Sequence, residues 1–329
     1  MTTRRAAIIA VVLSSSAARA ARAAPPSAES AECIAPAKPG GGFDLTCHLI
    51  KDAIAVSPAS GFAATKVTYF PGGIGALAFD RAVSQHWAQP NTVVAFSTGS
   101  LVNLAQGKFG PHRPDAVRWL ATVGIEYGVL AVRKGSRIQT LKGLLADLKS
   151  NAAAASFGAG GTVGSQDWIK AAMLTRAAGA DHRGMRFISY EGGGQAIAAL
   201  LGGHVDVFCG DAGEARAPLI SGELRALAIL APQRLSGPLG SIPTAREQGV
   251  DLIWPTVRGL YMGPGVSDSD YDRWSRVMRR LLDAPGFARM ARERGLDPYP
   301  MVGADVAAYA VRETLRMQEL AKSLGLGIR

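Results

Sequence analysis

The chain has 329 residues, of which 48% are hydrophobic and 19% are charged, and its formal net charge is +10. This length allows two domains with separate cores, and the composition is typical of a soluble globular protein. After the first 25 residues no run of 18 or more uncharged apolar residues occurs, which excludes a membrane-spanning helix beyond that point.

The first 24 residues differ from the rest of the chain. Arg4 and Arg5 precede the apolar run 6–13, which is followed by small residues and two Ala-Arg-Ala triplets. This pattern predicts a secretory signal peptide with a cleavage site near Ala20, Ala23 or Ala24. A disordered basic tail is the alternative. Removal of its four arginines lowers the formal charge from +10 to about +6. Such a modest positive charge suits a small anionic ligand. No basic run interleaved with aromatic residues indicates nucleic-acid binding.

Two of the three cysteines flank a glycine loop. Cys33 lies in the short apolar run before this loop, and Cys47 lies in the first turns of a predicted helix. In an exported protein a disulfide between them would fix the loop, whereas two reduced, half-buried cysteines are the alternative. Both readings stay open. Cys209 lies in the apolar run 205–209 and is predicted to be a core residue.

The glycine loop belongs to a strand–turn–helix unit. The apolar segment 33–35 leads through the glycines 40–42 into a helical pattern over 45–54. Glycine lets the backbone approach a ligand closely, and a helix N-terminus adds partial positive charge. Asp44 is predicted to be the N-cap of this helix. We interpret the loop as one half of an anion-binding site, with a second glycine loop as the other half.

The same unit recurs twice in the next fifty residues. Strands are predicted at 66–70 and 92–96, and the turns 71–75 and 97–100 lead from them into helices. Strands that alternate with helices predict a parallel sheet with crossover helices. Ligands of such sheets lie beyond the carboxyl ends of the strands, where all three turns are expected.

Residues 116–133 form a long apolar stretch with internal glycines, predicted to be two strands or one strand that crosses between domains. The strand and helix pattern then restarts. Its predicted elements are a helix at 141–148, a strand at 153–157, the glycine loop 158–164, a helix at 167–178, strands at 185–190, 205–209 and 224–230, and helices at 195–201 and up to about 220.

A second crossing is predicted at 252–262. Three helices follow, at 270–282, 287–294 and 305–324, and we expect them to pack on the first domain because no strands remain for a third. The sequence thus predicts an α/β protein of two lobes around a ligand cleft. Residues 25–128 and 257–329 form the first lobe, and residues 129–256 form the second.

Other chemistry finds little support in the residues. The run Gly158–Gly164 lies between a strand and a helix, and Glu191 ends the next strand, as in a dinucleotide site. The last glycine comes one residue late, however, and Glu191 lies nearly 30 residues on. The five histidines show no metal-ligand spacing, and no Gly-x-Ser-x-Gly elbow occurs. We therefore expect no cofactor, no metal and no enzymatic activity.

Arg258 lies among apolar residues at the second crossing. A guanidinium can bind a carboxylate through two hydrogen bonds, so this side chain could meet a ligand in the cleft. An ordinary ion pair with a glutamate of the protein is an equal alternative.

Five stretches of the chain, at 32–47, 156–165, 190–194, 199–207 and 254–263, match a family pattern. With them the sequence resembles the periplasmic substrate-binding proteins of tripartite tricarboxylate transporters, the Bug receptor family, in the branch nearest the tricarboxylate receptors. The resemblance covers essentially the whole mature chain. Phe43 stands where close relatives often have tryptophan, so the identity of the ligand cannot be inherited.

The resemblance implies a type II periplasmic-binding-protein fold and a monomeric periplasmic receptor. Such a receptor would capture a small organic carboxylate, with a di- or tricarboxylate favoured, and deliver it to the membrane permease. A co-receptor for a membrane sensor kinase and an exported enzyme are the alternatives. Carried over to this chain, the family's ligand-binding residues are Gly41, Gly42, Phe43 and Asp44 in one lobe and Gly161, Thr162 and Ser165 in the other. Ser97, Thr98, Tyr190, Asp211 and Arg258 are further candidates at the same cleft.

Overall fold

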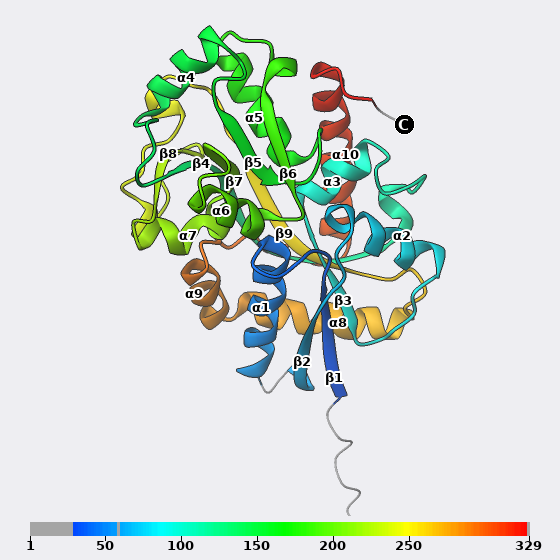
Figure 1. Ribbon diagram of the computed structural model, residues 1–329. Helices are drawn as coiled ribbons and strands as arrows, with labels where there is room; N and C mark the ends of the chain where they lie inside the picture. The colour runs from blue at the N-terminus through cyan, green and yellow to red at the C-terminus, as the bar shows by residue number, and fades with distance from the viewer. Residues whose placement is uncertain (1–28, 58–59, 328–329) are drawn as a thin grey trace, which may run out of the picture.

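The computed structural model describes residues 29–57 and 60–327. The predicted signal peptide, with its candidate cleavage sites Ala20, Ala23 and Ala24, lies outside the described residues. Over the described ranges, none of the helices combines the length and the apolar character needed to cross a bilayer. The chain folds into two α/β lobes, one above the other in Figure 1.

The first lobe, at the bottom of Figure 1, is built on a sheet with the strand order β2-β1-β3-β9-β4. β1 runs parallel to both β2 and β3, as the alternation of strands and helices predicted. Glycine or hydroxyl turns lead from each of these strands into a helix at the same edge of the sheet. The elements are β1 (Glu29–Ala35), α1 (Gly42–Ala55), β2 (Phe62–Tyr69), α2 (Ala76–Ser84), β3 (Thr92–Ser97) and α3 (Thr98–Ala105).

The second lobe repeats this plan with the strand order β7-β5-β6, and β5 runs parallel to both of its neighbours. Helices lie on both sides of these strands and bury their apolar faces against them. The elements are α4 (Leu141–Ser150), β5 (Ser156–Gly160), α5 (Gln166–Ala177), β6 (Arg186–Tyr190), α6 (Gly193–Leu201), β7 (Val207–Asp211), α7 (Ala212–Ile220) and β8 (Leu224–Leu230).

One long strand, β4 (Arg118–Arg133), crosses between the lobes. Residues 118–127 pair with β9 (Pro255–Met262), and residues 128–133 pair with β7 or β8. A Cβ at Gly124 would lie 3.0 Å from the Cβ of Leu296, and one at Gly128 would lie 2.9 Å from Cδ of Lys170. The internal glycines therefore allow neighbours to approach a continuous strand, and they do not mark its end.

The prediction of a parallel sheet is wrong for the crossing strands. β9 runs antiparallel to both β3 and β4, and β4 runs antiparallel to β7 and β8. The physical reason is the path of the chain, because β4 leaves the first lobe and β9 returns to it. The sheet is therefore mixed, with parallel strands in each lobe and antiparallel pairing where the lobes join.

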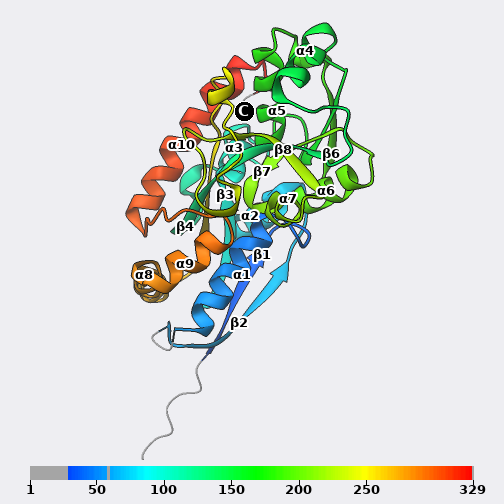
Figure 2. The same cartoon turned by 90° about the vertical axis from the view of Figure 1, so that its left-hand side faces the viewer.

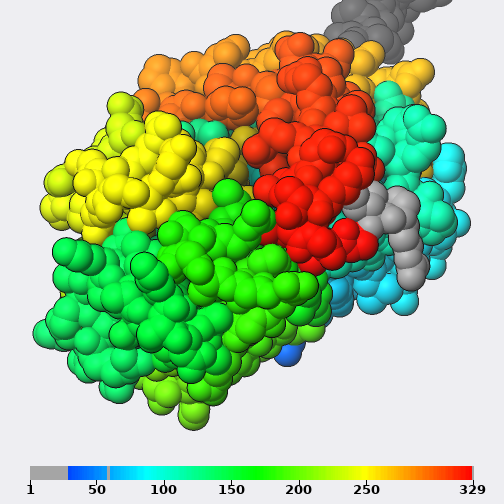
Figure 3. All heavy atoms as spheres, turned by 90° about the horizontal axis from the view of Figure 1, so that it is seen from above, coloured from blue at the N-terminus to red at the C-terminus, as the bar shows by residue number. Residues whose placement is uncertain are grey.

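Of the three C-terminal helices, α8 (Asp268–Asp283) and α9 (Pro285–Glu293) pack on the first lobe, as predicted. The prediction is wrong for the second half of α10 (Ala304–Ser323). Val306 belongs to an apolar cluster of the first lobe, whereas Met317 and Leu324 belong to the core of the second. A helix of 20 residues is about 30 Å long, which is enough to reach both lobes. Figures 2 and 3 show this red helix along both lobes.

Cys33 on β1 and Cys47 on α1 form a disulfide, with their Cα atoms 5.5 Å apart. The bond joins the strand and the helix on either side of the glycine loop, so it fixes both ends of that loop. Cys209 is free and buried, as predicted for a core residue.

Replacement of both Cys33 and Cys47 by serine is expected to lower the free energy of unfolding by about 2–4 kcal/mol, because the unfolded chain gains the entropy of an open loop. Urea unfolding followed by circular dichroism measures this change. Dithiothreitol should move the unfolding midpoint of the unaltered protein toward that of the variant and leave the variant unchanged. A midpoint that is insensitive to reduction would contradict the prediction.

Candidate functional site

Two adjoining cavities lie where the lobes meet. The first is a small space of about 40 Å³, and the second, of about 510 Å³, shares Ile74, Asn103 and Glu191 with it. Asp44 and Thr98 line neither cavity. Of the other predicted site residues, those at the first cavity are Gly41, Gly42, Phe43, Ser97, Ser165, Asp211 and Arg258, and those at the second are Gly161, Thr162 and Tyr190.

The first glycine loop presents a backbone amide to a carboxylate. Gly41 is the N-cap of α1, and the N–H of Gly42 donates to Oε1 of Glu214 at 2.7 Å. Glu214 lies on α7 in the opposite lobe, so this bond joins the two lobes. A Cβ at Gly42 would lie 1.9 Å from Nη1 of Arg258. Glycine is therefore required here by the close approach of a side chain.

Asp44 is not the N-cap that the sequence predicted, because α1 begins at Gly42 and not at Leu45. Its carboxylate reaches back over the loop, where Oδ2 accepts the N–H of Gly40 at 2.9 Å and Oδ1 accepts the hydroxyl of Tyr69 at 2.7 Å. Asp44 therefore holds the shape of the glycine loop from outside the cavity.

The end of β3 is fixed by its own hydroxyl groups. Ser97 caps α3, with its Oγ accepting the N–H of Gly99 at 3.2 Å, while Oγ of Ser100 accepts the N–H of Ser97 at 3.2 Å. Oγ1 of Thr98 accepts the N–H of Val257 at 2.9 Å and ties α3 to β9. Thr98 thus has a structural contact where the sequence predicted a ligand contact, and Ser97 lies at the wall of the first cavity.

The second glycine loop is held by the N-cap of α5. Ser165 is this cap, and its hydroxyl donates to the carbonyl of Gly160 at 3.0 Å and accepts the N–H of Trp168 at 3.3 Å. Gly161 has φ +84°, a left-handed conformation that favours glycine, and its N–H donates to the carbonyl of Tyr190 at 2.8 Å. The loop therefore reaches the cavity wall in a fixed conformation.

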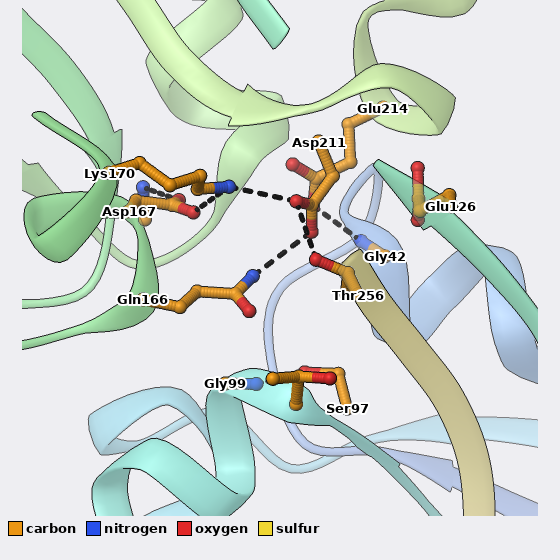
Figure 4. Close-up of polar contacts among 12 residues, drawn as sticks. Gly42, Ser97, Gly99, Glu126, Gln166, Asp167, Lys170, Asp211, Glu214 and Thr256 are labelled. Atoms are coloured by element: carbon orange, nitrogen blue, oxygen red, sulfur yellow. Dashed lines mark hydrogen bonds and ion pairs between the residues drawn. The ribbon is translucent and has the colours of Figure 1, made fainter. Parts of the chain in front are cut away.

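Behind the first cavity lies a buried network centred on Asp211, at the end of β7 (Figure 4). Its Oδ1 accepts from Nζ of Lys170 at 2.8 Å and from the hydroxyl of Thr256 at 2.9 Å. Its Oδ2 accepts from Nε2 of Gln166 at 3.0 Å and from Nη2 of Arg258 at 3.1 Å. Asp211 thus joins side chains of α5, β7 and β9.

Arg258 is 2% exposed and also pairs with the carboxylate of Glu126, on β4. This is the ion pair with a glutamate that the sequence left as the alternative to a ligand contact. Glu126 in turn accepts the N–H of Gly213, at the start of α7. Arg258 therefore has two carboxylate partners within the protein, although its side chain also lines the first cavity.

The pKa values of these acids differ with their partners. Burial opposes ionisation of Asp211, but the charges of Lys170 and Arg258 outweigh it and lower the pKa of Asp211. Burial raises the pKa of Glu126 against the opposing charge of Arg258. Burial, together with the charge of Asp211, raises the pKa of Glu214 to about 8. The raised pKa of Glu214 means that this buried side chain favours its protonated form at neutral pH.

Sequence reasoning missed Glu214, Glu126, Gln166, Asp167 and Lys170. A usable signal existed for two of them, because Glu126 and Lys170 are single charges inside apolar segments, and a buried charge needs a partner. Glu214 gave no such signal, since an acid in the first turn of a helix is ordinary. No group of three or more potential metal ligands occurs among the described residues.

Glu214→Gln is expected to stabilise the protein increasingly as the pH rises. The pKa of Glu214 is raised in the folded state, so its favourable contribution is complete below the unfolded pKa, near 4.5, and is lost as the pH rises through about 8. The difference in melting temperature between variant and unaltered protein should therefore grow from pH 4.5 to pH 9. A difference that is constant over this range would contradict the raised pKa.

Comparison with known proteins identifies the family. Residues 111–326 match the family model of the tripartite tricarboxylate transporter family receptor. A UPF0065 protein in the gbd 5′ region of Cupriavidus necator is 27% identical over 206 residues, which is 62% of this chain and 60% of that protein. The match thus spans about 60% of the length of this relative.

Solved structures share the fold. The periplasmic binding protein BugD has a TM-score of 0.79 at 20% identity, covering 92% of this chain and 99% of that protein. MatC from Rhodopseudomonas palustris, solved with bound malate, has a TM-score of 0.75 at 22% identity, covering 89% of this chain and 98% of that protein. Both share the two-lobed α/β fold of this chain. Because the family model matches more than half of its residues, the chain belongs to the tripartite tricarboxylate transporter receptor family, whose members are periplasmic solute-binding proteins.

Proposed function

We propose that this protein is a periplasmic receptor that captures a small organic carboxylate and delivers it to the permease of a tripartite tricarboxylate transporter. The contact between the Gly42 N–H and Glu214 carries the proposal, because this amide already binds a carboxyl oxygen at the junction of the lobes. The structure of MatC with malate supports a carboxylate ligand, and the predicted signal peptide supports a periplasmic location.

The mechanism is closure of two lobes around the ligand. Gly42 belongs to the first lobe, whereas Gly161 and Ser165 belong to the second, so a ligand that contacts both sides favours the closed form. The first cavity, at about 40 Å³, has room for little more than water when Glu214 occupies the Gly42 amide. We infer that a ligand enters when the lobes separate and that Glu214 moves as it binds.

A thermal-shift screen tests the proposed function. Mono-, di- and tricarboxylates are compared with the corresponding amides and alcohols, and the family resemblance favours the di- and tricarboxylates. A carboxylate that binds the native state at 100 times its Kd should raise its stability by about 2.7 kcal/mol, which is several degrees in melting temperature. If carboxylates give no shift across the series, the receptor proposal fails.

Gly42→Ala is expected to weaken carboxylate binding at least tenfold. The new Cβ would lie 1.9 Å from Nη1 of Arg258, and this guanidinium cannot move aside without leaving its buried carboxylates. Gly192→Ala is the matched control, since Gly192 lines the same cavity but a Cβ there meets nothing within 4 Å. Calorimetry with the best ligand of the screen measures both variants. Equal affinities would show that the Gly42 loop is not part of the site.

A further inference from the structure

We propose that the side chain of Ile74 divides the ligand cleft in two and so limits how far a ligand can extend from the first cavity into the second. The inference rests on the proposed receptor function and names a residue that sets the length of the ligand. It starts from the backbone of the turn between β2 and α2, where Ile74 lies.

Ile74 has a backbone conformation that its residue type disfavours. Its φ is +52° and its ψ is +53°, which is the left-handed region. Among the described residues, His86 is the one other residue besides glycine that has a positive φ. In this region the Cβ atom lies too close to the following carbonyl oxygen, and a branched Cβ makes the crowding worse. The backbone at Ile74 is therefore strained.

The neighbours of Ile74 show that the turn itself does not require this strain. Gly72, Gly73 and Gly75 also have positive φ, at +151°, +58° and +91°. Glycine adopts such conformations readily, so a fourth glycine at position 74 would remove the strain. The isoleucine is instead held in place by the contacts of its side chain. Residues in such disfavoured conformations cluster at ligand-binding sites, where the surrounding structure maintains them.

The contacts of Ile74 reach from one lobe to the other. On its own side the residue packs against the apolar cluster of the first lobe that includes Phe43. On the opposite side, a Cβ at Gly161 would lie 3.4 Å from Cγ1 of Ile74. Gly161 belongs to the glycine loop of the second lobe, so the side chain of Ile74 crosses the cleft between the two lobes.

Ile74 also lies at the border of the two cavities. It lines both of them, together with the polar residues Asn103 and Glu191. Gly42 lines the first cavity, so a ligand held by this amide has to pass these three residues to reach the larger space. A branched side chain on a fixed backbone has few rotamers with which to move aside. Ile74 therefore acts as an apolar partition.

Isothermal titration calorimetry with the linear dicarboxylates from malonate to suberate tests the inference, since these probes differ only in the number of CH₂ groups. The affinity of the unaltered protein should fall beyond one chain length. In Ile74→Ala and in Ile74→Gly it should continue to rise, by about fourfold for each further CH₂ group that is buried. Ile74→Ala retains the strain and Ile74→Gly removes it, so a common effect identifies the side chain as the cause.

The control is Leu77→Ala, which removes another apolar side chain from the same turn. A Cβ at Gly72 would lie 2.9 Å from the Cβ of Leu77, but Leu77 lines neither cavity, so the dependence on chain length should stay unchanged. The inference is overturned if both Ile74 variants keep the original length dependence, or if it changes in Ile74→Gly alone. Binding of other carboxylates but of no member of the series would also overturn it and leave the receptor intact. If every carboxylate of the thermal-shift screen is silent, the proposed function itself fails.

Discussion

The rest of the candidate site depends on the contacts of Asp211, at the end of β7. This one carboxylate accepts hydrogen bonds from Lys170 and Gln166 of α5 and from Thr256 and Arg258 in the first half of the crossing strand β9. A buried ion pair recovers its cost of desolvation only when its geometry is good and its remaining hydrogen bonds are made. Here each of the two oxygens of Asp211 accepts two hydrogen bonds. The positions of Arg258 and of the Gly42 loop packed against it follow from that arrangement.

The closeness of Arg258 to Gly42 explains why the site is made of backbone on one side and charge on the other. The guanidinium lies against the first residue of α1, so the helix can offer its amide but no side chain at that point. Glu214 then reaches the amide from the opposite lobe. The protein therefore supplies a carboxyl oxygen of its own to a loop whose geometry suits carboxylates in general.

The sequence predicted the glycine loops that line the two cavities, because these depend on local chain geometry. We identified the loop at Gly41 and Gly42 and the loop at Gly161 because glycines between a strand and a helix let the backbone approach another group closely. The sequence could not predict which groups meet across the cleft. For Arg258 the sequence could not decide between a ligand carboxylate and a glutamate of the protein, since only tertiary packing brings Glu126 beside it. Asp44 was placed at the helix cap because the two residues that begin α1, Gly42 and Phe43, carry no helical signal of their own.

In the fold, too, the local elements could be predicted from the sequence, whereas their packing partners could not. Amphipathic spacing predicted α10 and the face that it buries, but it carries no information on which lobe that face meets. The sequence also could not predict the direction of β9, because an apolar run has the same pattern in a parallel and in an antiparallel strand pair. Elements are set by neighbours in the sequence, whereas their partners are set by the path of the chain.

The position of α10 restricts how the receptor can open. Val306 and Ala310 are buried in the first lobe, and Met317 and Leu324 are buried in the second. To separate the lobes along this helix would expose such side chains to water, at a cost of about 1.5–3 kcal/mol for each large one. The glycine loops, by contrast, meet the opposite lobe in hydrogen bonds of Gly42 with Glu214, of Gly164 with Gln106 and of Val163 with Lys108, which water can replace. The opening proposed above would therefore be a rotation whose axis runs near the C-terminal helix, with the widest gap at the loops.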